Sequence, residues 1–160
     1  MTKHTLLAID PGRYTGYALL DMEGGKTFEV GLLDRGEPYY RERLISVIKR
    51  ADRLAIESQF IHTGKKQNFQ TVQRIIEAKQ EVVTLWHIVH GPNIIPLHVQ
   101  PQQWQRSLGI RSKSRPEIKA ESKGLASRLT ERNITNSDMA DAVNIGAYAA
   151  TEIQAAEQNE

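Results

Sequence analysis

The sequence predicts an α/β fold in which a mixed sheet of five strands is flanked by helices. Short apolar runs, typical of buried strands, alternate with longer segments of helical periodicity. Three strand segments come first, and helices then alternate with strands, an order typical of a sheet that is partly antiparallel and partly parallel. The chain has 160 residues and no cysteine, and we expect residues 1–160 to form a single domain without disulfides.

Residues 4–9, 15–21 and 27–34 are expected to form the first three strands. The first is a continuous apolar run that ends at Asp10-Pro11-Gly12, a typical turn sequence. Turns that contain glycine connect the three segments. We therefore expect neighbouring strands to pair antiparallel, in the order 3-2-1.

The period of the apolar pattern changes after residue 34. Apolar residues recur at helical spacing over about 39–51, and a second apolar run over 52–57 ends in Glu57. If the helix between the two runs is a crossover, the new strand lies parallel to the first. The carboxyl ends of these strands would then be neighbours, which would bring Asp10 and Glu57 together.

Residues 69–90 form the longest segment of helical periodicity. Its apolar stripe is wider than burial against one sheet requires. The stripe contains Phe69, Val72, Ile76, Val83, Trp86 and His90. One interpretation is a partner helix in a homodimer, and the other is simple burial against the sheet.

The C-terminal half is expected to be mostly helical. Residues 94–99 are predicted as a short strand near a sheet edge, because Pro96 cannot donate a ladder hydrogen bond. Helices are predicted over 101–108, 116–130 and 137–154, with a disordered tail from about residue 155.

Charge is unevenly distributed, although the net charge is only +2. Residues 103–132 carry eight basic and three acidic side chains, whereas residues 138–160 carry five acidic ones and no Lys or Arg. A basic segment next to an acidic cluster is typical of a polyanion bound beside a metal site. A solvated helix face with mixed charges is the alternative.

Four acidic residues occupy positions from which they can meet. Asp138 and Asp141 lie three residues apart in a helical pattern, so their side chains share a face, and Asp10 and Glu57 end predicted strands. Such residues also act as ordinary turn and helix-capping residues. Four carboxylates in one pocket repel one another unless divalent cations neutralise them, and ligation by oxygen alone favours Mg²⁺ or Mn²⁺.

The order of elements is that of the ribonuclease H-like fold, and three motifs resemble those of the RuvC-type Holliday junction resolvases. The motifs are Ile9-Asp10-Pro11-Gly12 with Thr15-Gly16-Tyr17-Ala18, Ile56-Glu57-Ser58-Gln59-Phe60 and Asp138-Met139-Ala140-Asp141-Ala142. The resemblance extends from residue 4 to about residue 150. It implies a homodimeric, Mg²⁺-dependent endonuclease that nicks two strands of a four-way DNA junction symmetrically, in the cytoplasm of a bacterium or a phage-infected host.

The resemblance also implies roles for individual residues. Four carboxylates would be catalytic and would hold two Mg²⁺ ions, for which Mn²⁺ would substitute: Asp10, Glu57, Asp138 and Asp141. A lysine of the basic segment would assist at the scissile phosphate, with Lys113 as the first candidate and Lys119 as the second. DNA contacts are expected from one aromatic and several basic residues: Phe60, Lys65, Lys66, Arg111, Lys113, Arg115 and Lys119. For Phe60, an anchor in the core is the alternative, and for Lys65 and Lys66 a solvated turn.

Other functions stay open at this point. Some members of this family act broadly on branched DNA, and a protein with this fold could also bind junctions without cutting them. Residues 10–16 also resemble the phosphate loop of the actin and sugar-kinase superfamily, but that class normally needs a second domain and a second glycine-rich loop. The histidines have no zinc spacing, and His87, His90, Trp86 and Trp104 are expected to be structural.

Overall fold

The computed structural model describes residues 4–58 and 68–159. Its elements are, in chain order, β1 (Thr5–Asp10), β2 (Tyr14–Asp21), β3 (Lys26–Asp34), α1 (Tyr40–Ile48), β4 (Arg53–Glu57), α2 (Phe69–His90), β5 (Leu97–Val99), α3 (Pro101–Ser107), α4 (Arg115–Thr130) and α5 (Ser137–Glu157). The strands form one sheet in the order β3-β2-β1-β4-β5. The predicted mixed sheet is therefore confirmed.

Strand β1 lies at the centre of this sheet and has two different neighbours. It pairs antiparallel with β2, where Ile9 lies opposite Tyr17, and parallel with β4, where Ile9 lies beside Ile56. The pair β2–β3 is antiparallel and the pair β4–β5 is parallel. This register brings the carboxyl ends of β1 and β4 side by side, so Asp10 and Glu57 end adjacent strands.

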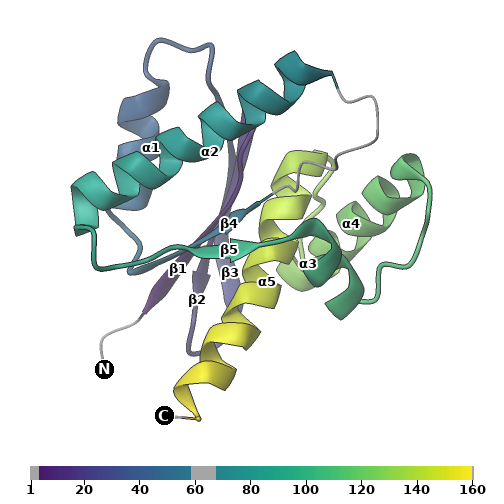
Figure 1. Ribbon diagram of the computed structural model, residues 1–160. Helices are drawn as coiled ribbons and strands as arrows, with labels where there is room; N and C mark the ends of the chain where they lie inside the picture. The colour runs from purple at the N-terminus through teal and green to yellow at the C-terminus, as the bar shows by residue number, and fades with distance from the viewer. Residues whose placement is uncertain (1–3, 59–67, 160) are drawn as a thin grey trace.

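Helices cover both faces of the sheet (Figure 1). Leu7 and Ile9 of β1 pack in a core with α1 and α2, whereas Leu6 and Ala8 pack in a second core with α3, α4 and α5. All four side chains are fully buried. A strand that is buried on both faces needs apolar residues at every position, which explains the uninterrupted apolar run at the start of the sequence.

Helix α5 packs closely on β1 and β2 because its inner side consists mainly of small residues. Ala142, Gly146 and Ala149 are buried there. A Cβ atom at Gly146 would lie 2.5 Å from Cδ1 of Leu20 and 3.1 Å from Cβ of Ala8. This close approach keeps the N-terminal turns of α5 against the sheet.

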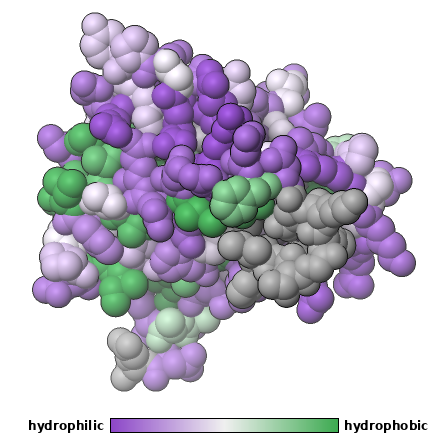
Figure 2. Space-filling view, turned by 45° about the horizontal axis from the view of Figure 1, so that its top comes forward, coloured by the Kyte–Doolittle hydropathy of each residue, from purple (hydrophilic) through white to green (hydrophobic). Residues whose placement is uncertain are grey.

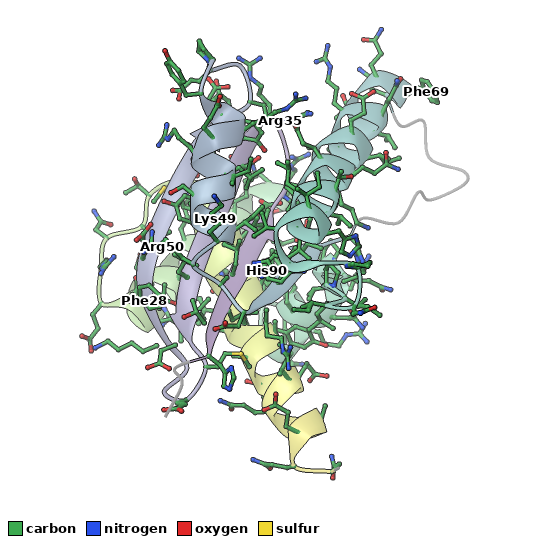
Figure 3. The ribbon with its side chains drawn as sticks, turned by 90° about the vertical axis from the view of Figure 1, so that its left-hand side faces the viewer. Phe28, Arg35, Lys49, Arg50, Phe69 and His90 are labelled. Carbon is green, nitrogen blue, oxygen red and sulfur yellow. The ribbon has the colours of Figure 1, made fainter. Side chains whose placement is uncertain are left out.

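Helix α2 spans the predicted residues, but the predicted apolar stripe is buried at its C-terminal end and exposed at its N-terminal end. Ala78, Val82 and Trp86 are its buried residues, whereas Phe69 is 77% exposed and Ile76 is 37% exposed. Figure 3 shows Phe69 at the free end of the helix, pointing away from the sheet. A seven-residue spacing drifts by about 20° per heptad on a straight helix, so positions far apart in the stripe face different directions.

Three boundaries differ clearly from the prediction. Helix α1 ends at Ile48 rather than at about residue 51. Strand β5 begins at Leu97 rather than at residue 94, since Pro96 has no N–H to donate to the neighbouring strand. Helix α5 continues to Glu157, past residue 155 where the sequence predicts a disordered tail, and the Gln154 side chain donates a hydrogen bond to the carbonyl of Met22. None of the helices in the described ranges is long and apolar enough to cross a membrane.

A shared carboxylate joins α2 to the rest of its layer. Glu81 accepts hydrogen bonds from Arg35 at 2.9 Å and from Arg41 at 2.6 Å. Arg35 follows β3, and Arg41 lies in the first turn of α1. Figure 3 shows Arg35 between α1 and α2. These ion pairs fix α2 relative to the sheet end that carries Asp10.

Candidate active site

Three elements bring the acidic residues to one end of the sheet. Asp10 and Glu57 are the last residues of the neighbouring strands β1 and β4, and Asp138 and Asp141 lie in the first turns of α5. The start of α5 rests on the backbone of β2, because a Cβ atom at Gly16 would overlap the carbonyl group of Asp138. Gly16 itself pairs with Asp10. The lack of a side chain at residue 16 therefore lets the helix reach the end of β1.

Asp10 is the centre of this acidic cluster. Its pKa is raised well above the ordinary value, first by desolvation and then by the charges of Glu57, Asp141 and Asp138. Lys119 lowers this pKa, but its effect is the smallest of those named. Asp10 therefore interacts electrostatically with all three other carboxylates, in a place where water does little to screen them.

The two carboxylates of α5 are perturbed in the same direction. Desolvation raises the pKa of Asp141 to about 6, against a hydrogen bond from Ser122 that lowers it. Desolvation also raises the pKa of Asp138, while the charges of Lys119 and Arg115 lower it. The cluster thus holds more negative charge than these two cations balance.

Two carboxylate oxygens of the acidic cluster accept hydrogen bonds from side chains that are not part of the cluster. The indole Nε1 of Trp104 donates to Oε2 of Glu57 at 2.8 Å. Oγ of Ser122 donates to Oδ1 of Asp141 at 2.5 Å, and Nδ2 of Asn144 donates to Oγ of Ser122 at 2.9 Å. Trp104 was expected to be structural, and no pattern in the sequence points to Ser122 or Asn144. Trp104 is indeed buried, but it also contacts a candidate site residue.

The donor set of the cluster fits a hard divalent cation. Four carboxylates supply only oxygen ligands, and a divalent cation would offset the charge that raises their pKa values. Within the described part of the chain, however, no three acidic or histidine side chains are arranged to hold a metal ion as they stand. Oε2 of Glu57 and Oδ1 of Asp141 accept protein hydrogen bonds. Small side-chain rotations would thus accompany metal binding.

The predicted basic residues differ in their electrostatic effect on the acidic cluster. Lys119, on α4, lowers the pKa values of Asp10, Asp138 and Asp141. Arg115 is exposed and lowers the pKa values of Asp138 and Asp141, whereas Lys113 and Arg111 are exposed in the segment before α4. Three predicted DNA contacts lie outside the described residues: Phe60, Lys65 and Lys66.

A polar network that the sequence analysis missed lies at the end of β4. Nζ of Lys79 donates to Oγ of Ser58 at 2.5 Å, and Nδ1 of His98 lies 3.1 Å from the same hydroxyl oxygen. Desolvation lowers the pKa of Lys79. Because Ser58 directly follows Glu57, this network fixes the chain where it leaves the strand. In the sequence, Lys79 is only a polar residue that interrupts the apolar stripe of residues 69–90.

The raised pKa of Asp141 predicts how stability depends on pH. In the unfolded chain this carboxyl titrates near pH 4, so between about pH 4 and 6 the folded protein binds more protons than the unfolded one. The protonated Asp141 carboxyl therefore contributes to the stability of the folded protein below about pH 4, and this contribution is lost as the pH rises through 6. Without metal, the free energy of unfolding relative to Asp141→Asn should fall by about 2 kcal/mol between pH 4 and 7.

Urea unfolding in EDTA at several pH values measures this difference. Addition of Mg²⁺ at pH 7 should restore stability to the wild type more than to Asp141→Asn. An equal pH dependence in the two proteins would contradict the desolvation of Asp141 in the folded state.

Comparisons with known proteins agree with this fold. No protein-family model matches the sequence, and no curated protein matches it. The solved structure of Thermus thermophilus RuvC in complex with a Holliday junction substrate has a TM-score of 0.70 at 17% identity, over 96% of each chain. Another T. thermophilus RuvC structure has a TM-score of 0.65 at 16% identity, over 94% of this chain and 96% of that chain. The yeast mitochondrial Holliday junction resolvase Ydc2 has a TM-score of 0.54 at 16% identity, over 92% of this chain and 78% of that chain.

The sheet order and the flanking helices define a ribonuclease H-like α/β protein. Within that class, the chain has the fold of the RuvC-type Holliday junction resolvases. The fold that the three sequence motifs predict is therefore confirmed.

Proposed function

We propose that this protein is a metal-dependent endonuclease that resolves four-way DNA junctions by paired, symmetric nicks. One observation carries the proposal: β1, β4 and α5 bring four carboxylates to one end of a ribonuclease H-like sheet, where desolvation and mutual repulsion raise the pKa of Asp10. Carboxylates repel DNA, and a desolvated group of them is costly to keep without a cation. A solved structure with the same fold is a RuvC in complex with a Holliday junction substrate.

The acidic residues would hold two Mg²⁺ ions, with Mn²⁺ as a substitute. Asp10, whose charge interacts with those of the other three carboxylates, would hold the ions together with Glu57, and Asp138 and Asp141 would complete the site or position the water. When bound, such ions activate a water for attack on a phosphodiester and stabilise the leaving oxygen. The products would carry 5′-phosphate and 3′-hydroxyl ends.

The basic segment would bind the DNA backbone. Among the two candidate lysines, we now favour Lys119 for the contact with the scissile phosphate, because its charge acts on three of the carboxylates. Lys113 would bind a flanking phosphate, together with Arg111 and Arg115, which are exposed beside it. The roles of Phe60, Lys65 and Lys66 stay predictions.

A junction-cleavage assay tests this function. The full chain is incubated with a four-way junction labelled on each strand in turn, in Mg²⁺, in Mn²⁺ and in EDTA, with the cut positions mapped at nucleotide resolution. We expect paired nicks at symmetric positions that require the metal, and no cleavage of a linear duplex of the same sequence. Equal cleavage of flaps and three-way junctions would instead indicate a broader branched-DNA nuclease. Binding in EDTA with no cleavage in either metal would indicate a junction-binding protein.

We also propose that the chain forms a homodimer through the outer side of α2. Phe69, Val72 and Ile76 follow one another at helical spacing on this side, and Phe69 and Ile76 are exposed, whereas Val83 packs partly against the core of its own chain. Figure 2, which shows the molecule from the side of α1 and α2, has apolar surface at several places among hydrophilic residues. A dimer would place two acidic clusters in one particle, as paired nicks require.

Ile76→Glu is expected to convert the dimer into a monomer. The side chain is 37% exposed, so the new charge would meet the partner helix rather than the core of its own chain. Ile88→Glu is a matched control, because Ile88 is 72% exposed and lies about 120° away around the same helix. Sedimentation at several protein concentrations should show a monomer for the first variant and a dimer for the second. A dimer in both variants would rule out this interface.

A further inference from the structure

The two tryptophans of the chain have different hydrogen-bond partners, although both are buried. Nε1 of Trp86 donates to the backbone carbonyl of Ile94 at 2.8 Å, so this buried N–H group has a hydrogen-bond partner in the core. Nε1 of Trp104 donates to Oε2 of Glu57 at 2.8 Å. Trp104 is 1% exposed and Glu57 is 8% exposed. The second hydrogen bond therefore joins a core residue to a carboxylate of the acidic cluster, with little competition from water.

The backbone around Trp104 is well fixed. Strand β5 pairs with β4, with Val99 beside Glu57, and only Gln100 separates β5 from α3. The backbone N–H of Gln100 donates to the side chain of Gln103 at 2.9 Å, and Pro101 is the first residue of the helix. The sheet register thus determines where the indole of Trp104 lies relative to Glu57.

An N–H group at one carboxylate oxygen limits how the carboxylate can turn. A hydrogen bond to the charged form also favours that form, which is the form that binds a cation. A buried indole N–H needs an acceptor, and for Trp104 this acceptor is the carboxylate of Glu57, whereas for Trp86 it is a backbone carbonyl.

We propose that Trp104 is a positioning residue for Glu57. Its indole N–H holds Oε2 of Glu57 and so directs the carboxylate toward Asp10 for metal binding. This inference rests on the proposed function, since it concerns the same acidic cluster. It predicts that the indole proton of Trp104 responds when a cation binds at the cluster, and that the indole proton of Trp86 does not.

Nuclear magnetic resonance of the ¹⁵N-labelled indole groups tests this directly. The full chain has two tryptophans, so two indole signals are expected, each assigned by its loss in Trp104→Phe or Trp86→Phe. Titration with Mg²⁺ should shift the Trp104 signal and leave the Trp86 signal in place. The midpoint should match the Mg²⁺ concentration at which the thermal unfolding temperature rises. In Glu57→Gln the Trp104 signal should shift before any metal is added, because an amide oxygen is a weaker acceptor than a carboxylate.

The variant Trp104→Phe tests the consequence for metal binding. It keeps an aromatic ring and removes the N–H, and we expect Mg²⁺ affinity to fall by about 10- to 100-fold. Cleavage should recover at high Mg²⁺ concentration, and the unfolding temperature measured in EDTA shows whether the variant is folded before metal is added. If this variant does not fold, the wild-type titration and Glu57→Gln still decide the question.

The possible failures can be told apart. If Mg²⁺ binds and the junction is cut, but the Trp104 signal stays in place and Trp104→Phe keeps its Mg²⁺ affinity, the inference is wrong and the proposed function stands. If Mg²⁺ neither shifts a signal nor raises the unfolding temperature, and no cleavage occurs, the proposed function fails and the inference fails with it.

Discussion

Asp10→Asn is expected to abolish junction cleavage and to keep junction binding at least as strong as in the wild type. Asp10 interacts with all three other carboxylates of the cluster, so its loss affects the whole set of metal ligands. Loss of several kcal/mol of transition-state stabilisation corresponds to a decrease in rate of about 10³-fold or more. Removal of a negative charge near the DNA backbone favours binding. Single-turnover cleavage and gel-shift assays with the same four-way junction measure the two effects.

Asp21→Asn is the matched control for this experiment. Asp21 also ends a strand, but it lies at the other end of the sheet, where it pairs with Thr5. The Asp21→Asn variant should cleave junctions at the wild-type rate. Asp10→Asn should also unfold at a higher temperature than the wild type in EDTA at neutral pH, because it removes a desolvated charge. Cleavage by Asp10→Asn at the wild-type rate would exclude this acidic cluster as the active site.

Gly16→Ala is expected to have the second-largest effect, on both stability and cleavage. A Cβ atom at residue 16 would overlap the carbonyl group of Asp138 and would lie 2.9 Å from the backbone N of Met139. Backbone atoms of a helix cannot rotate away as a side chain can, so the start of α5 would have to move. We expect a loss of about 1–3 kcal/mol in the free energy of unfolding. A displacement of about 1 Å in Asp138 and Asp141 would lower cleavage by about 10²-fold.

Gly124→Ala separates this effect from the general effect of adding a methyl group. Gly124 lies inside α4, and the nearest atom to a Cβ there is Nη1 of Arg128, at 3.7 Å. Ala is the better helix former by up to about 1 kcal/mol, so this variant should be slightly more stable and fully active. Urea unfolding and the junction assay compare the two variants. Wild-type stability in Gly16→Ala would mean that α5 does not approach β2 as closely as the structure has it.

The sequence predicted the sheet order and each of the two pairs of carboxylates, because these depend on local patterns. Asp10 and Glu57 each end an apolar run, and the crossover rule makes those runs parallel neighbours. Asp138 and Asp141 share a helix face through their spacing alone. That this helix lies across the ends of the two strands does not follow from local patterns, and was expected only from the resemblance to the RuvC-type resolvases.

The surroundings of the cluster could not be predicted in the same way. The hydrogen bond from Trp104 to Glu57 joins residues that are 47 positions apart, and that from Ser122 to Asp141 joins residues 19 apart. Both depend on how α3 and α4 pack against the sheet and α5. The choice between Lys113 and Lys119 stays a prediction for the same reason, because the spacing of charges does not tell which side of α4 faces the acidic residues.

The central position of β1 has a consequence for the motions of this protein. A strand that is hydrogen-bonded on both edges and covered on both faces is among the last segments to open, and its amide protons are among the slowest to exchange with solvent. Fraying of the chain ends or of the outer helices would leave it in place. Asp10 therefore lies at the end of one of the last segments of the native state to open. Local fluctuations elsewhere would displace the other carboxylates of the cluster before they displaced Asp10.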